Sequence, residues 1–251
     1  MLIIFYASII VFTFIFIFLI KNNGAKIKGS FGEHKVHKTL VSLGSEYVSL
    51  HDMLIRNANG ATSQIDHLVL SEYGIFVIET KYYKGWIFGN EKSENWMQVI
   101  FKEKYPFRNP IKQNWSHIYT LKNILADFPQ TAYYSIVVFA GNATLKDIKS
   151  SVPVIYWNEL NGTIKAASTK KCLSSDDVLR IKKLLESKAV TEKGAQQQHI
   201  RAIQQDITER RLKTENLICP RCNGELKLRN SRNGKFYGCE NYPRCRFTMP
   251  Y

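Results

Sequence analysis

Four cysteines near the carboxyl end constrain this chain more than any other feature of its sequence. Two residues separate Cys219 from Cys222, sixteen separate Cys222 from Cys239, and five separate Cys239 from Cys245. Two thiol pairs with this spacing supply the four tetrahedral ligands of a structural zinc ion. A domain of this size buries too little core to fold alone, so metal binding would supply the missing energy. The sequence therefore predicts one Zn²⁺ in a small zinc-ribbon-like domain at 217–251.

The distribution of the cysteines also indicates a reducing compartment. Of the five cysteines, only Cys172 lies outside the carboxyl-terminal group. A secreted disulfide scaffold would distribute its cysteines throughout a short chain, so this clustering favours metal binding. We expect Cys172 to be an inert, partly buried thiol.

The charge of the chain indicates a polyanionic partner, either nucleic acid or an anionic membrane surface. The formal net charge is +14, and residues 219–251 carry seven basic and two acidic side chains. Around the cysteines, cations alternate with aromatic residues, which suits a surface that holds phosphates and stacks bases. The alternative is a solvated basic surface whose aromatic side chains fill a small core. The candidate nucleic-acid-binding residues are Lys227, Arg229, Arg232, Lys235, Phe236, Tyr237, Tyr242, Arg244 and Arg246.

An apolar run at the amino terminus predicts a single-pass membrane anchor. Residues 2–20 contain only Ser8 and Thr13 as polar interruptions, and a helix of this length just spans the ~30 Å hydrocarbon layer. Three lysines among residues 21–28 follow the run, so the rest of the chain is expected in the cytoplasm. A cleaved signal peptide and a buried core helix are the alternatives. A signal peptide requires a basic residue before the apolar run and a small-residue cleavage site after it, and neither is found here.

Hydrophobic periodicity predicts an α/β domain after this run. The predicted helices span residues 30–43, 110–125 and 175–187. The predicted strands span residues 46–50, 64–71, 74–81, 134–140 and 153–156, with a tight hairpin at 72–73. Asn109 is expected to cap the second helix, with a buried stripe of Ile111, Trp115, Ile118 and Leu125. The order helix, three strands, helix, strand describes an α/β sandwich.

These patterns divide the chain into four parts. The predicted parts are a transmembrane anchor at 2–20, an α/β domain at 29–187, a polar helical linker at 188–216 and the cysteine domain at 217–251. The third part is rich in glutamine and arginine around a sparse apolar spine, so it is expected to be a linker or a weak partner helix.

Three charged residues lie near the ends of the apolar strands 64–71 and 74–81, Asp66 near the start of the first and Glu79 and Lys81 at the end of the second. Glu79 and Lys81 are two residues apart and project to the same side of a strand, and Asp66 lies near the same edge if the hairpin pairs. Carboxylates can hold Mg²⁺ or Mn²⁺, which polarises a phosphate and generates hydroxide, while a lysine stabilises charge. The alternative is an exposed Glu–Lys pair on a solvated surface. The flanking apolar runs nevertheless place this charge at the ends of buried strands, where an unpaired charge is costly.

Blocks of sequence around these residues resemble a known family. SFGEHKVHKTL, QIDHLVLSEYGIFVIETKYYKGWI and NPIKQNWSHIYTLKNIL are similar to successive motifs of the NERD, or nuclease-related, domain. That family is assigned to the PD-(D/E)xK nuclease superfamily. The resemblance runs from about Gly29 to Leu125, with weaker support to about Tyr156. It implies a restriction-endonuclease-like sandwich and a metal-dependent hydrolysis of phosphodiester bonds.

The resemblance also implies roles for individual residues. It implies Mg²⁺ or Mn²⁺ ligands at Asp66 and Glu79, with the Thr80 carbonyl as a third candidate, a catalytic lysine at Lys81, an auxiliary acid at Glu33, and the helix glutamine at Gln113. Alternatives remain for two of these. Glu33 could instead complete a capping box with Ser30, and Gln113 could be an ordinary helix residue. The six histidines show no paired ligand spacing, so none is predicted to bind metal.

The segment from Cys219 to Thr248 resembles the four-cysteine zinc finger that is repeated at the carboxyl end of bacterial type I topoisomerases, where it binds single-stranded DNA. The sequence is therefore interpreted as a membrane-anchored protein that binds DNA, single-stranded by this resemblance, with a metal-dependent deoxyribonuclease core. The alternative function is a non-catalytic nucleic-acid adaptor that uses the nuclease fold only for recognition. RNA also remains open as a substrate.

Overall fold

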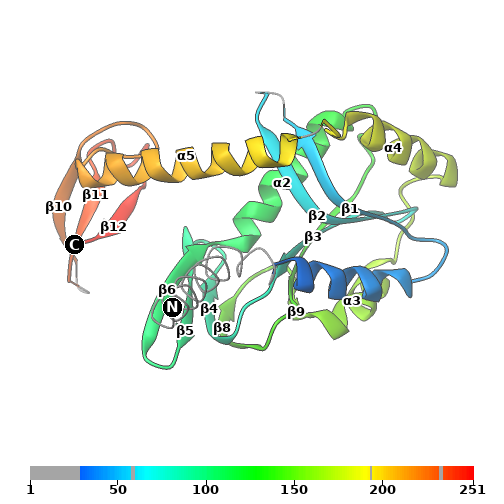
Figure 1. Cartoon of the computed structure of the whole chain (residues 1–251), viewed down its shortest axis with the longest axis horizontal. Coiled ribbons are helices and arrows are strands. Elements are labelled where there is room, and N and C mark those ends of the chain that lie inside the picture. Colours follow the sequence, from blue (N-terminus) through cyan, green and yellow to red (C-terminus); the bar gives the residue numbers. More distant parts are fainter. Residues whose placement is uncertain (1–28, 58–59, 193, 232–233) are drawn as a thin grey trace, which may run out of the picture. The chain divides into compact units, whose positions relative to one another are not determined.

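The computed structural model describes residues 29–57, 60–192, 194–231 and 234–251 (Figure 1). It divides the chain into two compact units, with the boundary between Val190 and Thr191. The predicted anchor at 2–20 lies outside the described residues. Within the described ranges, no helix is both long and apolar enough to cross a membrane.

A five-stranded mixed sheet forms the centre of the first unit. Its strand order is β1-β2-β3-β7-β9. The strands are β1 (Val48–Arg56), β2 (Thr62–Ser71), β3 (Gly74–Lys81), β7 (Tyr133–Phe139) and β9 (Val154–Tyr156). The first three strands pair antiparallel, whereas β3, β7 and β9 pair parallel. Strand β3 is a continuous apolar run because helices cover both faces of the sheet.

Helices cover the two faces of this sheet and enclose two hydrophobic cores. The helix at residues 29–41 and α3 (Leu160–Ala167) pack on one face. Helices α2 (Pro110–Ile124) and α4 (Ser175–Lys188) pack on the other face. The α/β class is thereby confirmed, and the last residues of β3 emerge from between the two cores.

Helix α2 shows both a confirmed and a wrong prediction. Asn109 caps it as predicted, because its side chain accepts hydrogen bonds from the Ile111 and Lys112 amides. Trp115 was predicted to be buried, but it is 39% exposed. The buried position in that turn belongs to Asn114, whose Nδ2 donates to the Val77 carbonyl at 2.7 Å. A buried strand carbonyl in need of a donor therefore decides which residue of the turn faces the sheet.

A second, four-stranded sheet has the order β6-β5-β4-β8. Its strands are β4 (Gly85–Asn90), β5 (Asn95–Ile100), β6 (Glu103–Arg108) and β8 (Ala143–Lys149). The strands and helices predicted from sequence include none of these four strands, nor helix α3. Strand β8 gives a weak signal because Ala143 is its only buried residue. It forms because it pairs parallel with β4.

The second unit begins with helix α5 (Ala195–Glu215). This helix buries little, and three ion pairs at i,i+4 spacing support it, from Asp206 to Arg210, Glu209 to Lys213 and Arg211 to Glu215. A three-stranded antiparallel sheet follows, with the order β10 (Leu226–Ser231), β11 (Gly234–Cys239) and β12 (Thr248–Pro250).

Candidate active site and metal centre

Strands β2 and β3 diverge at the predicted acidic residues. Their regular pairing ends at His67 and Ile78, while β3 continues beside β7 as far as Lys81. Beyond that point the Thr80 amide donates to Asp66 Oδ2 at 2.8 Å. The Asp66 carboxylate therefore accepts the hydrogen bond that a neighbouring strand would otherwise accept from Thr80. The charged side chains lie where the two strands separate.

The structure brings Glu79, Lys81 and Gln113 together. Lys81 Nζ donates to Glu79 Oε1 at 2.6 Å and to Gln113 Oε1 at 3.2 Å. The alternation of β3 points Glu79 and Lys81 to the α2 side of the sheet, and α2 supplies Gln113. The Glu79 side chain is only 1% exposed and that of Lys81 only 17%. The solvated surface pair considered from sequence is therefore not what the structure shows.

His117 is a member of this cluster that the sequence interpretation missed. Its Nε2 lies 3.3 Å from Glu79 Oε2, and its Nδ1 lies 2.7 Å from Ser63 Oγ. A signal was available, since His117 follows Gln113 by one helical turn and must lie on the same side of α2. Spacing among the histidines alone could not reveal it.

The electrostatics of the cluster separate the two carboxyl groups. Burial raises the pKa of Asp66 well above its usual value, and the Glu79 carboxylate adds to this increase. Burial also acts to raise the pKa of Glu79, but Lys81 and His117 outweigh it and hold that pKa below its usual value. For Lys81, burial would lower the pKa, yet Glu79 and Asp66 raise it. One carboxyl group thus favours the neutral form while its neighbour is held ionised.

Glu33 lies at the margin of this cluster. Burial raises its pKa, and the charges of Asp52 and Glu79 raise it further. The described part of this helix begins at Gly29 and includes Ser30, and both interpretations of Glu33, auxiliary acid and capping box, stay predictions. Gly32 allows the close approach of this helix, because a Cβ there would meet the side chains of Tyr82 and Ala140.

The residues present fit a divalent cation. Beyond its close approach to His117 Nε2, the buried Glu79 Oε2 has no hydrogen-bond partner among the described residues. A buried carboxylate oxygen without a donor is costly. A cation between Asp66 and Glu79 would satisfy this oxygen and favour the ionised form of Asp66. The third predicted ligand, the carbonyl of Thr80, belongs to the same segment of β3, although Thr80 is paired with Val138 of β7.

Three histidines form a separate cluster near the other face of the sheet. His51 Nδ1 and His67 Nδ1 lie 2.8 Å apart, and the His37 ring lies 4.0 Å from that of His51. Burial lowers the pKa of His51 to about 4 and that of His67 to about 3. The His51 and His67 rings are therefore neutral at neutral pH.

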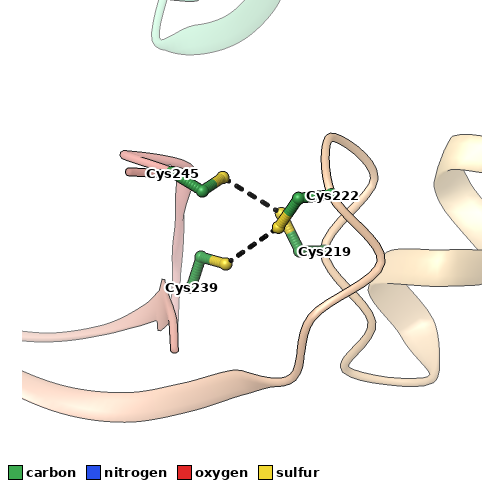
Figure 2. Close-up of side chains that lie close together, drawn as sticks. All are labelled: Cys219, Cys222, Cys239 and Cys245. Carbon is green, nitrogen blue, oxygen red and sulfur yellow. Dashed lines mark hydrogen bonds between the residues drawn. The ribbon is translucent and has the colours of Figure 1, made fainter. Parts of the chain in front are cut away.

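The four cysteine sulfurs converge from two knuckles (Figure 2). All four Sγ atoms lie within 4.8 Å of one another. The distance is 3.6 Å from Cys219 to Cys245 and 3.3 Å from Cys222 to Cys239. Four sulfurs at 2.3 Å from a tetrahedral zinc ion would be about 3.8 Å apart, so the arrangement fits zinc.

The backbone around the cysteines explains this convergence. In the first knuckle the Cys219 amide donates to the Gly224 carbonyl at 2.7 Å, and in the second the Cys245 amide donates to the Asn241 carbonyl at 2.9 Å. A Cβ on Gly224 would meet the Asn241 amide group, so a larger residue there would displace that side chain. Asn241 Nδ2 also donates to Cys222 Sγ at 3.4 Å, and this bond contributes most to lowering the pKa of Cys222 to about 6.

The predicted nucleic-acid-binding residues divide between the two faces of the small sheet. Arg229 pairs with Phe236 across β10 and β11, and its guanidinium carbon lies 6.0 Å from the ring of the exposed Tyr242. Tyr237 points the other way and packs against the cysteine core. For Tyr237 the structure supports the mini-core alternative. Tyr251, which was not predicted, is 72% exposed.

The remaining predicted cations are not equivalent. Lys227 is paired with Glu240 at 3.3 Å and Glu225 at 3.7 Å, and Lys235 Nζ lies 5.8 Å from the Tyr251 ring. Arg244 and Arg246 are exposed. Arg232 lies outside the described residues.

Comparison with known proteins matches both units. A family model described as "Nuclease-related domain" matches residues 28–140, and one described as "Topoisomerase DNA binding C4 zinc finger" matches residues 217–251. An uncharacterized protein of Bacillus anthracis is 33% identical over 187 residues, which cover 73% of this chain and 87% of the relative. No solved structure matches the chain.

The zinc segment has its own relatives. It is 49% identical over 39 residues to the DNA topoisomerase 1 of Methanocaldococcus jannaschii and 61% identical over 33 residues to that of Archaeoglobus fulgidus. Each match spans only 5% of the topoisomerase. Together with the sulfur geometry, the family match identifies the four cysteines as a structural zinc site.

Proposed function

Because this chain belongs to the nuclease-related domain (NERD) family and ends in a C4 zinc finger of the topoisomerase type, we propose that it is a metal-dependent deoxyribonuclease. The zinc finger would hold the DNA, single-stranded by preference, and the first unit would hydrolyse its phosphodiester bonds. The observation that carries this proposal is the cluster of Asp66, Glu79 and Lys81, in which Glu79 is buried and the other two side chains are half-buried. Withdrawing charged groups from water is energetically costly, and clusters of such groups are typical of functional sites.

The proposed chemistry assigns a role to each side chain. Asp66 and Glu79 would hold Mg²⁺ or Mn²⁺, with Thr80 contributing its carbonyl. When bound, the ion would supply Lewis acidity toward the phosphate and a nucleophilic hydroxide. Lys81 would stabilise negative charge that develops on the phosphate oxygens.

Three further residues would hold this arrangement in place. Gln113 would orient the Lys81 ammonium through the 3.2 Å hydrogen bond. His117 would keep the Glu79 carboxylate ionised and positioned. Glu33 would serve as the auxiliary acid at the margin of the cluster.

The direct test is an assay of the purified full-length protein on labelled single-stranded, double-stranded and branched DNA with Mg²⁺, Mn²⁺ or EDTA. Metal-dependent cleavage is expected on at least one substrate. Binding without cleavage under every condition would instead establish the non-catalytic adaptor. RNA substrates belong in the same series.

Affinity for DNA is expected to depend on the zinc finger. Replacing Arg244 and Arg246 with glutamine should weaken binding to single-stranded DNA and lower the slope of log K against log salt by about 1.4, because each lost phosphate contact contributes about 0.7. The measurement is fluorescence anisotropy without added Mg²⁺ or Mn²⁺ and without a chelator, which would strip the zinc, at several salt concentrations. Lys183→Gln, at an exposed position in the first unit, is the matched control. An unchanged slope in the double variant would rule out these arginines as phosphate contacts.

We also propose that the apolar run at 2–20 anchors the protein in a membrane, with both units in the cytoplasm. The full-length protein should then sediment with membranes and resist carbonate extraction, and deletion of residues 1–21 should release it. Native protein in the soluble fraction, trimmed near residue 21, would establish a cleaved signal instead.

A further inference from the structure

One face of the four-stranded sheet presents aromatic and apolar side chains to solvent. Across the strands, Thr144 pairs with Trp86, Trp86 with Val99, and Val99 with Lys104. Directly paired residues share a face of a sheet, so these side chains form one row. In the adjacent row Phe88 pairs with Met97. The intervening residue Ile87 is fully buried on the opposite face.

Lysines flank this row at both ends. Trp86 is 50% exposed, and the Lys146 ammonium lies 4.9 Å from its ring. Lys146 lies where the pairing of β4 and β8 shifts register, so a bulge directs it over the tryptophan. Lys104 stands at the other end of the row and is exposed. One acidic residue, Asp147, lies beside Phe88. An aromatic ring between two cations suits a base between two phosphates.

The sheet is firmly joined to the candidate active site. Strand β4 begins at Gly85, four residues after Lys81. Both glycines at this junction lie against backbone, because a Cβ on Gly85 would collide with the Val99 carbonyl and one on Gly141 with the Tyr83 backbone. The parallel pairing of β3 with β7 is followed by the parallel pairing of β4 with β8. The row containing Trp86 is therefore held in a fixed relation to Lys81.

We propose that this face binds a single-stranded segment of DNA, with a base stacked on Trp86 and phosphates held by Lys104 and Lys146. The inference rests on the proposed function, because it assigns to the nuclease unit its own substrate-binding surface in addition to the zinc finger. A single strand is favoured over a duplex because only unpaired bases offer their faces to an exposed aromatic ring. The flanking positive charge favours a polyanionic strand over an uncharged protein partner.

The test is photochemical cross-linking of the full-length protein to 4-thiothymidine-substituted oligo(dT) without added Mg²⁺ or Mn²⁺, followed by peptide mapping. A cross-linked peptide containing Trp86 is expected, and it should disappear in Trp86→Ala while any cross-link within the zinc finger persists. Affinity of that variant for oligo(dT) should fall by about tenfold. Trp86→Phe, which keeps an aromatic face, should recover most of the loss. Trp115→Ala, at an exposed tryptophan on α2, is the matched control and should bind normally.

The lysines provide an independent readout. Lys104→Gln and Lys146→Gln should each lower the salt slope by about 0.7, and Lys183→Gln should not. The inference is overturned if Trp86→Ala binds and cross-links like the wild type. It is also overturned if that variant loses binding only to anionic phospholipid vesicles. These binding measurements omit Mg²⁺ and Mn²⁺ and so do not depend on cleavage. A protein that binds through Trp86 but fails to cleave in the separate assay with Mg²⁺ or Mn²⁺ would support this surface and reject only the nuclease proposal.

Discussion

Replacing Glu79 with alanine is expected to abolish metal-dependent DNA hydrolysis while leaving DNA affinity, measured without added Mg²⁺ or Mn²⁺, nearly unchanged. Lys81 and His117 hold the pKa of Glu79 below its usual value, and its buried Oε2 has no hydrogen-bond partner among the described residues. Loss of the proposed ion would remove several kcal/mol of transition-state stabilisation, so the rate should fall by about a thousandfold. The measurement is single-turnover cleavage at saturating DNA, compared with anisotropy titrations of the same variant.

Lys81→Met is the companion variant because it removes the charge but keeps the length of the side chain. It should slow hydrolysis while binding of the divalent ion and of DNA survives, since the proposed role of Lys81 is to stabilise charge. Lys84→Met, three residues along the chain, serves as the control for removing a lysine. If Glu79→Ala cleaves as well as the wild type, the activity belongs to other residues or to a contaminant.

Replacing Cys239 with alanine is expected to unfold the carboxyl-terminal zinc domain. Residues 219–251 hold a core built around the cysteines themselves, and structural zinc contributes roughly 10–16 kcal/mol in such domains. Three remaining ligands cannot close the tetrahedral site. Zinc content should fall from one per chain to near zero, and limited proteolysis should remove residues 217–251 first.

Cys172→Ala is the matched control, since this thiol lies outside the zinc site and packs at the edge of the core beneath α2 and α4. It should retain one zinc ion per chain. Thermal unfolding of the first unit should be similar in both variants, because its cores contain none of the four zinc ligands. Absence of zinc from wild-type protein purified under reducing conditions would end the zinc interpretation.

Local spacing explains which parts of the site could be predicted from sequence. Cys219 and Cys222 meet through a single knuckle, and Glu79 and Lys81 share a face because of strand alternation, so neither pair depends on knowledge of the whole fold. The cap at Asn109 is local in the same way. The role of Gln113 came only from family resemblance, because its contact with Lys81 spans 32 positions in the chain.

Features set by tertiary contacts were beyond the sequence patterns. His117 belongs to the cluster because it contacts Glu79, which lies on a different element. Trp115 and Asn114 exchange their expected places because the Val77 carbonyl needs a donor. In the zinc domain, the alternation of cations and aromatic residues did not reveal which side chains would share a face. Tyr237, predicted to bind nucleic acid, instead packs against the cysteine core.

The crossover between β3 and β7 bears on how the chain acquires its proposed activity during synthesis. Asp66, Glu79 and Lys81 belong to the antiparallel meander of β1, β2 and β3, which is joined by short turns and can form early. Gln113 and His117 arrive only with α2, and the last residues of β3 gain a neighbour only when β7 pairs with them. Such long-range parallel pairing is slow. A nascent chain that ends before α2 therefore carries the acidic residues without the groups proposed to orient them. We expect such a chain not to cleave DNA until folding is complete.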